Sequence, residues 1–197
     1  MNHRGAQADF DTRKALHAAL PIAVILLLAM SALAAAQDSS RPIKPSEAVK
    51  TQVYVSLDPV PRGRQFEVAA VAEVAPGYHV QANKVLQDYL IPLTLTPEVP
   101  AGFRVVSTGY PKANVVKFGF AKQPMAVYEG RFVVRIKLEA AAGVPTGSTT
   151  IPITLRFQAC NDQLCLPPTK LPLSAEFEVA PAGAAAKAVH PEIFRKE

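Results

Sequence analysis

The amino-acid sequence predicts an all-β protein built as an antiparallel β-sandwich. Several segments alternate apolar and polar residues, which places one set of side chains on a core face and the other on a solvent face. Turn-forming Pro and Gly residues separate these segments, and no long helical pattern intervenes. The chain also holds 18 prolines in 197 residues, and a proline inside a helix costs about 3 kcal/mol. A helical bundle is therefore excluded.

Five long segments carry the alternation, and each is predicted to form a strand. In the second of them, Phe66 and Val68 share one face, while Glu67 and Glu73 lie on the other. Alternate side chains of a strand point to opposite faces, so this pattern is typical of a half-buried strand. The predicted strands are 51–55, 66–74, 132–138, 151–157 and 171–179, and the shorter candidates are 89–96 and 103–107.

Proline and glycine mark the ends of these strands. Pro-Gly turn signals lie at 61–63, 76–77, 100–102 and 145–147. Pro152 and Pro172 instead fall inside strand patterns. Because proline cannot donate to a ladder, we expect these two residues at sheet edges or bulges.

Residues 1–36 have the three parts of a secretory signal peptide. Basic residues precede an apolar run from Ile22 to Met30, and small residues follow it up to Ala36. The run is about half of the roughly 20 apolar residues that span a bilayer. We therefore expect Sec-type export with cleavage after Ala36, to a location outside the cytosol where disulfides persist. An uncleaved N-terminal anchor is the alternative.

The rest of the chain divides into a leader, one domain and a tail. We expect 37–50 to be a flexible leader and 51–180 to be the sandwich domain. The tail, 181–197, is rich in small residues, and it either lacks fixed structure or forms a short helix with 190–197 as a docking segment. The chain carries 21 Lys and Arg against 16 Asp and Glu, a net charge of +5 without a basic block. The sequence therefore predicts no nucleic-acid partner and no stable membrane insertion after cleavage.

Cys160 and Cys165 are the two cysteines of the chain, and they bracket a predicted tight turn after the strand 151–157. Residues this close along a turn are able to form a disulfide. A structural disulfide in so short a loop adds roughly 2 kcal/mol through loop closure. The alternative is a redox-active pair, because a short loop brings two thiols together and a turn presents them to a partner. The spacing by itself leaves both hypotheses open.

Further candidates for chemistry are His79 and Asp162. A cationic imidazole near a thiol favours the thiolate, so His79 is a candidate for tuning a cysteine, although a lone histidine is more often structural. Asp162 lies between the cysteines, where a carboxylate raises a thiol pKa or serves the turn together with Asn161. A Cu(I) site made of the two cysteines, His79 and Met125 would need a ligand-spacing motif, which the sequence lacks. We therefore expect no metal and no cofactor.

The run 157–168, FQACNDQLCLPP, resembles the active-site segment of the N-terminal periplasmic domain of the thiol:disulfide interchange protein DsbD. In this family an aromatic-Gln-small-Cys run is followed by a second cysteine and a Pro-Pro pair. Two further stretches resemble the family's Gly-Tyr segment and its cap-loop region, namely 76–80 and 110–120 with 127–130. The resemblance covers most of 51–179.

The resemblance implies an immunoglobulin-like β-sandwich that carries one exchangeable cysteine pair. Cys165 matches the cysteine that forms mixed disulfides with partners, and Cys160 matches its resolving partner. Phe118 and Phe120 are candidates for the aromatic cap that shields the sulfurs. In the family this domain takes electrons from a thioredoxin-like domain and passes them to periplasmic thioredoxin-like proteins. We therefore expect such partners and a periplasmic location.

The sequence also departs from the family's pattern. The spacing between the cysteines is one residue shorter than in the best-known member. The membrane domain and the terminal thioredoxin domain of full-length DsbD are missing from the sequence, so we expect a separate protein as electron donor. The alternative, from another functional class, is a non-catalytic periplasmic interaction or assembly module whose disulfide is structural.

Overall fold

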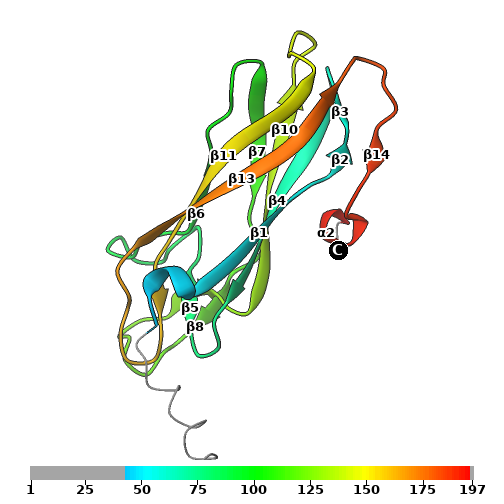
Figure 1. The fold of residues 1–197 in the computed structure, drawn as a ribbon. Helices are drawn as coiled ribbons and strands as arrows, with labels where there is room; N and C mark the ends of the chain where they lie inside the picture. The colour runs from blue at the N-terminus through cyan, green and yellow to red at the C-terminus, as the bar shows by residue number, and fades with distance from the viewer. Residues whose placement is uncertain (1–42, 196–197) are drawn as a thin grey trace, which may run out of the picture. The chain divides into compact units, whose positions relative to one another are not determined.

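Two four-stranded sheets face each other across an apolar core in a computed structural model of the chain (Figure 1). The structure describes residues 43–195. The predicted signal peptide, 1–36, and most of the predicted leader lie outside the described residues. Within residues 43–195, no helix is both long enough and apolar enough to cross a membrane.

The first sheet has the strand order β1-β4-β10-β7, and all of its pairs are antiparallel. A short 3-10 helix, η2 (Pro45–Glu47), precedes it. Its strands are β1 (Val49–Val55), β4 (Gln65–Val74), β7 (Phe103–Gly109) and β10 (Arg131–Ala140). In β10 every second residue from Phe132 to Ala140 is buried. This is the period-two pattern from which the strand was predicted.

The second sheet has the order β3-β13-β11-β6. Its strands are β3 (Val60–Pro61), β6 (Thr94–Pro97), β11 (Gly147–Phe157) and β13 (Thr169–Ala180), with β3 parallel to β13 and the other pairs antiparallel. Pro172 lies on an edge stretch of β13, because the β3 ladder reaches that strand at Val179 and Ala180. Pro152 lies one residue beyond the ladder between β11 and β6. Pro172 therefore lies at a local edge, as expected. Pro152 does not, because it pairs with Ser174 on one side and its carbonyl oxygen accepts the Glu98 N–H at 2.8 Å on the other.

A third, smaller sheet has the order β12-β5-β9-β8 and carries Cys160. Its strands are β5 (His79–Gln81), β8 (Asn114–Val116), β9 (Met125–Tyr128) and β12 (Ala159–Cys160). In Figure 1, β5 and β8 lie below the two larger sheets. The cysteines follow directly after β11, so the sandwich supports the site through the end of that strand.

Side chains from both larger sheets fill the core. Ile153, Leu155 and Phe157 of β11 are almost completely buried. The ring of Phe66 on β4 packs against Phe177 on β13 across the two sheets, with centroids 5.0 Å apart. The predicted all-β sandwich is therefore confirmed, together with its five long strands.

Two expectations about element boundaries differ from the structure. The short candidate strand 89–96 is wrong in its first half, because β6 begins at Thr94 and Tyr89 is exposed in a loop. The neighbouring Leu90 packs outside the main core, with Met125 and Val127. β1 begins at Val49, inside the expected leader, because Val49 is buried in the core.

The C-terminal tail folds back onto the first sheet. Its strand β14 (Lys187–Ala188) pairs with β2 (Leu57–Asp58), and a short helix, α2 (Pro191–Phe194), follows. Ile193 is buried in a small cluster with Ala69 and Val71 of β4. The Arg135 side chain donates hydrogen bonds at 2.6 and 3.2 Å to the carbonyl oxygen of Ile193. Neither form expected for the tail is found as stated: its described part docks through Ile193, but the small-residue part is extended and not helical.

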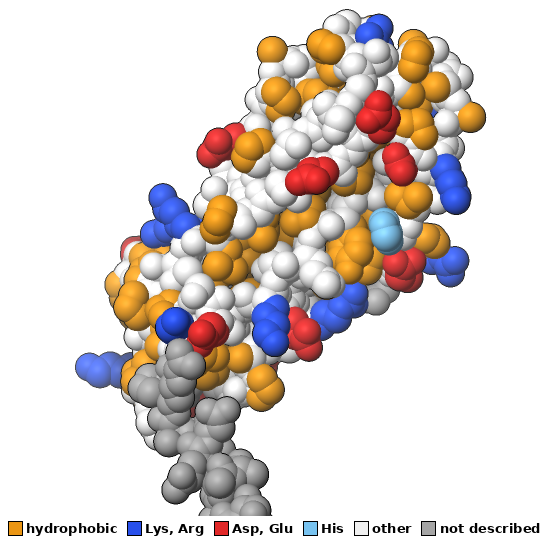
Figure 2. All heavy atoms as spheres, in the orientation of Figure 1, with side chains coloured by type: hydrophobic (Ala, Val, Ile, Leu, Met, Phe, Trp, Pro, Cys, Tyr) orange, Lys and Arg blue, Asp and Glu red, His pale blue; other side chains and the backbone are white. Residues whose placement is uncertain are grey.

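Charged side chains of both signs are interspersed on the face of the molecule in Figure 2. Apolar side chains are visible between them. This mixed surface follows from the sequence, in which 21 basic and 16 acidic residues are spread along the chain.

Candidate functional site

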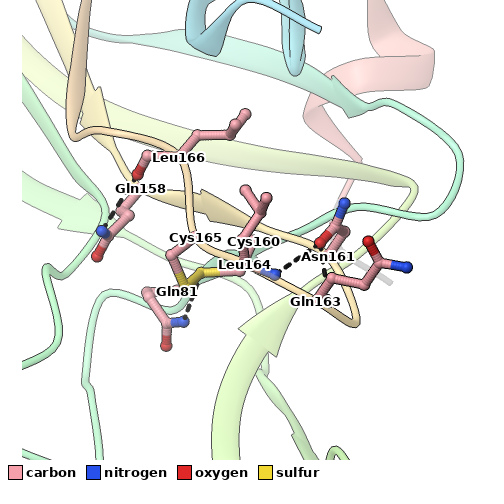
Figure 3. Close-up of a disulfide and its surroundings, with 8 residues drawn as sticks. All are labelled: Gln81, Gln158, Cys160, Asn161, Gln163, Leu164, Cys165 and Leu166. Carbon is pink, nitrogen blue, oxygen red and sulfur yellow. Dashed lines mark hydrogen bonds between the residues drawn. A yellow bond between two sulfur atoms is a disulfide. The ribbon is translucent and has the colours of Figure 1, made fainter. Parts of the chain in front are cut away.

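Cys160 and Cys165 face each other across a short hairpin and are joined by a disulfide (Figure 3). Two backbone hydrogen bonds flank them, from Asn161 N–H to Leu164 O at 2.9 Å and from Leu166 N–H to the carbonyl oxygen of residue 159 at 2.8 Å. The cysteines therefore form a non-hydrogen-bonded pair, the position at which facing Cα atoms of antiparallel strands come closest. Their Cα atoms are 3.9 Å apart.

The hairpin turn is held by side-chain amides. Asn161 Oδ1 accepts the backbone N–H groups of Gln163 and Leu164, each at 2.9 Å (Figure 3). This is the local turn chemistry expected of an asparagine at such a position. Gln158 Nε2 donates to the Leu166 carbonyl oxygen at 3.2 Å and ties the two sides of the hairpin together. The turn residues thus hold the two cysteines opposite each other.

The two cysteines have unequal surroundings. Cys160 is completely buried, whereas Cys165 is exposed. The difference follows from the strand pairing, because Cys160 belongs to β12 and pairs with His79 of β5. Cys165 lies on the outer side of the hairpin, just before Leu166 and two exposed prolines. A partner molecule therefore has access to Cys165 and not to Cys160.

His79 and Gln81 are the buried polar side chains within residues 43–195, and both lie on β5 beside Cys160. Gln81 Nε2 lies 3.8 Å from Cys160 Sγ and donates a hydrogen bond to it (Figure 3). Within the described part of the chain, His79 Nε2 and Gln81 Oε1 have no hydrogen-bond partner. A buried polar atom left unpaired costs about 1–3 kcal/mol. Two such destabilising side chains next to one sulfur indicate a functional site.

Sequence reasoning named His79 and missed Gln81. One signal in the sequence could have identified Gln81: it lies two residues after His79, and residues i and i+2 of a strand lie on the same face. All three residues of β5 are buried, so the segment has no alternation that would have identified it as a strand.

The two cap candidates, Phe118 and Phe120, lie in the loop between β8 and β9. Phe118 stacks on the His79 ring, with centroids 4.0 Å apart and planes inclined by 15°. The Phe120 ring lies 5.5 Å from that of Phe118. Phe118 is half-buried, whereas Phe120 is exposed. The cap loop therefore contacts His79, which is the ladder partner of Cys160. Shielding of the sulfurs by either phenylalanine ring stays a prediction.

Carboxylates border the site on one side. A cleft of about 440 Å³ is lined by His79 and Phe118 together with three acidic residues, Glu73, Glu129 and Asp162. Burial lowers the pKa of His79 below its usual range, and the carboxylate of Asp162 opposes this shift. The cleft beside the cap loop is therefore acidic, and the imidazole next to it favours its neutral form.

The residues weighed for a Cu(I) site are only partly brought together. His79 pairs with Cys160 in the ladder, but both cysteines are bonded to each other. Met125 is buried in a different cluster, with Leu90 and Val127. Across residues 43–195, no three His, Cys, Asp or Glu side chains are grouped so as to hold a metal ion.

Comparisons with known proteins give one family. The family model described as thiol:disulfide interchange protein DsbD, N-terminal, matches residues 40–174. A comparison with curated protein sequences gives no match.

Two solved structures are similar at low sequence identity. The reduced N-terminal domain of Neisseria meningitidis DsbD is 17% identical, with a TM-score of 0.41 over 74% of this chain and 94% of that one. The N-terminal periplasmic domain of Proteus mirabilis ScsB is 13% identical, with a TM-score of 0.47 over 71% of this chain and 52% of that one. The match to the family model spans both cysteines and most of the sandwich, and the chain belongs to the DsbD N-terminal domain family.

Proposed function

We propose that the protein is an exported thiol–disulfide exchange domain that passes electrons to or from other periplasmic thiol proteins through Cys160 and Cys165. The observation that carries this proposal is the pairing of an exposed Cys165 with a buried Cys160 on one hairpin. A disulfide with one accessible sulfur has a defined point of attack and a defined leaving group. Membership of the DsbD N-terminal domain family supports the same chemistry.

In the proposed reaction, a partner thiolate attacks Cys165 Sγ. A disulfide forms between the partner and Cys165, the bond between Cys165 and Cys160 breaks, and Cys160 Sγ leaves with the electron pair. A second thiolate of the partner then attacks the mixed disulfide and releases Cys165 as a thiolate. The protein gains two electrons and the partner becomes a disulfide. The reverse sequence passes the electrons to an oxidised partner, with Cys165 attacking and Cys160 resolving.

The proposed partners are periplasmic thioredoxin-like proteins, with a separate protein as electron donor. The family supports this class of partner. The acidic cleft beside the cap loop, bordered by Glu73, Glu129 and Asp162, favours a partner with basic side chains around its own cysteine.

Trapping of mixed disulfides tests the proposal. In cells that express Cys160→Ala, the mixed disulfide at Cys165 has no resolving thiol, so a covalent complex should accumulate in the periplasmic fraction. It should run as a larger band on a non-reducing gel and disappear on reduction. Cys165→Ala is the matched control, because the remaining cysteine is buried, and it should trap little or nothing.

Two outcomes would count against this proposal. If Cys165→Ala traps the partner as readily as Cys160→Ala, the roles of the cysteines are wrong. The second outcome has three parts: neither variant traps a protein, both variants lose about 2 kcal/mol of stability, and the pair has a reduction potential below about −300 mV. In that case the disulfide is structural and the protein is a non-catalytic module.

A further inference from the structure

We propose that Gln81 is a further catalytic residue of the exchange reaction, whose side-chain amide stabilises the negative charge that develops on Cys160 Sγ. This inference rests on the proposed function, because it concerns the same sulfur atoms.

The geometry around Gln81 is fixed from two sides. β5 pairs with β12 at His79 and Val80, and with β9 at Val80 and Gln81. In addition, the Gln81 backbone N–H donates to the Gln158 carbonyl oxygen at 3.3 Å, two residues before Cys160. The side chain is completely buried, and its Nε2 lies 3.8 Å from Cys160 Sγ (Figure 3). The donor is therefore held in place before any reaction begins, which is the condition for electrostatic preorganisation.

The stability of the oxidised protein does not account for this arrangement. A neutral disulfide sulfur is a weak hydrogen-bond acceptor, and the Oε1 atom of Gln81 has no partner within the described residues. The same N–H group interacts much more strongly with a thiolate, because a charged acceptor strengthens a hydrogen bond. The interaction thus becomes favourable as charge forms on the sulfur, which is how a group accelerates a reaction.

The charged sulfur appears in both directions of the exchange. When a partner thiolate attacks Cys165, a bond forms between the partner sulfur and Cys165 Sγ, and the electron pair of the broken disulfide moves to Cys160 Sγ. In the reverse step, the Cys160 thiolate attacks Cys165 Sγ and expels the partner as a thiolate. Gln81 keeps both of its amide protons throughout and acts only as a donor. A buried thiolate without such a donor would be strongly disfavoured.

His79 and Asp162 are the titratable groups identified beside Cys160. His79 is its ladder partner on β5, and Asp162 is on the turn. The test leaves both residues in place, so their influence on the sulfur is the same in every protein compared.

The thiol pKa of Cys160 is the most direct readout. It is measured in a Cys165→Ala background from the ultraviolet absorbance of the thiolate as a function of pH, without any partner. Adding Gln81→Met, which keeps the length of the side chain and removes the N–H, should raise the thiol pKa by about one unit, a tenfold loss of thiolate at a given pH. In the protein with both cysteines, Gln81→Met should slow reduction by dithiothreitol severalfold, by less than the tenfold change in the acid constant, since a leaving thiol of higher pKa leaves more slowly.

The matched control is Gln65→Met. Gln65 lies on β4, and its Nε2 donates to Glu139 Oε2 at 3.0 Å. This variant removes an amide from a strand without touching the cysteine region, so it should change neither the thiol pKa of Cys160 nor the rate of reduction. An equal thiol pKa of Cys160 with and without Gln81→Met would overturn the inference about Gln81. The proposed exchange function would still stand, because it is tested separately by the trapping of mixed disulfides.

A second measurement needs no substitution at Gln81 and covers the case in which Gln81→Met fails to fold. In the Cys165→Ala protein, the side-chain amide resonance of Gln81 should shift with pH, and its midpoint should equal that of the thiolate absorbance. An amide resonance that stays constant while the thiolate forms would overturn the inference.

Discussion

The imidazole of His79 is buried and stacks against Phe118, one strand away from Cys160. Its Nε2 atom lacks a hydrogen-bond partner among the described residues. Burial lowers the pKa of His79 below its ordinary value, with Asp162 acting in the opposite direction. Protonation of the ring at this position is therefore unfavourable in the folded protein.

We expect the free energy of unfolding to decrease as the pH falls through the titration range of His79. Because its pKa is lower in the folded protein, the unfolded chain binds the extra proton first, below about pH 6.5. The stabilisation is complete above that pH and is lost towards the folded-state pKa, with a slope of at most about 1.4 kcal/mol per pH unit. Urea unfolding at several pH values measures this slope.

The comparison protein for that experiment is His79→Phe. It keeps an aromatic ring next to Phe118 and removes the titrating group, so its stability should depend less steeply on pH below about pH 6.5. Identical slopes in the two proteins would show that His79 is not the responsible group.

At the scale of elements, the loop between β8 and β9 connects the apolar cluster around Met125 with the cysteine strand. Phe118 packs against that cluster and stacks on His79. The Lys117 side chain donates to the carbonyl oxygens of Ala121 and Lys122 within the same loop. Phe118 is thus held from several sides, whereas the Phe120 side chain is exposed.

The cap hypothesis predicts different results for the two phenylalanines. Phe118→Ala removes the ring that lies on His79, next to Cys160, so non-specific alkylation of the cysteine pair in the reduced protein should become about tenfold faster, equivalent to about 1.4 kcal/mol of activation free energy. Phe120→Ala should have a smaller effect, because Phe120 reaches His79 at a centroid distance of 6.5 Å against 4.0 Å for Phe118.

Val115→Ala, an exposed position on the neighbouring strand β8, controls for general loosening of the loop. It should leave the alkylation rate unchanged. If both phenylalanine variants also react at the original rate, the two rings are ordinary structural residues and the cap hypothesis fails.

At the scale of the whole molecule, the C-terminal tail closes over the outer face of β4. Ala69 and Val71 point away from the main core, and they are nevertheless buried, together with Ile193 of the tail. The Arg135 guanidinium holds the same turn of α2 through the Ile193 carbonyl oxygen. The tail therefore supplies the covering that lets β4 carry small apolar residues on both faces.

We expect Ile193→Ala to lower the free energy of unfolding by about 2 kcal/mol, because it removes the apolar contact with Ala69 and Val71. Glu192→Ala is the control, since this neighbour on α2 is exposed, and it should change stability by less than about 0.5 kcal/mol. Urea denaturation measures both variants. An Ile193→Ala protein as stable as Glu192→Ala would mean that the tail does not stabilise the sheet.

The sequence by itself determined the sandwich and the cysteine hairpin. Both depend on local patterns, since alternation with period two places side chains on the two faces of a strand. The hairpin follows from a short spacing and an asparagine turn. The long strands were therefore predicted within a few residues of their observed ends, and Pro172 was assigned to the right kind of position.

Tertiary structure alone decided what surrounds the cysteines and what covers β4. Gln81 and Cys160 are 79 residues apart in the chain, and no local pattern connects them. β5 has three residues, all of them buried, so it lacks the alternation that identifies a strand. The tail likewise carries a single buried residue, Ile193, in its helix. In each case the deciding contact joins short segments from distant parts of the chain, and the local residue pattern of a short segment does not specify its distant partner.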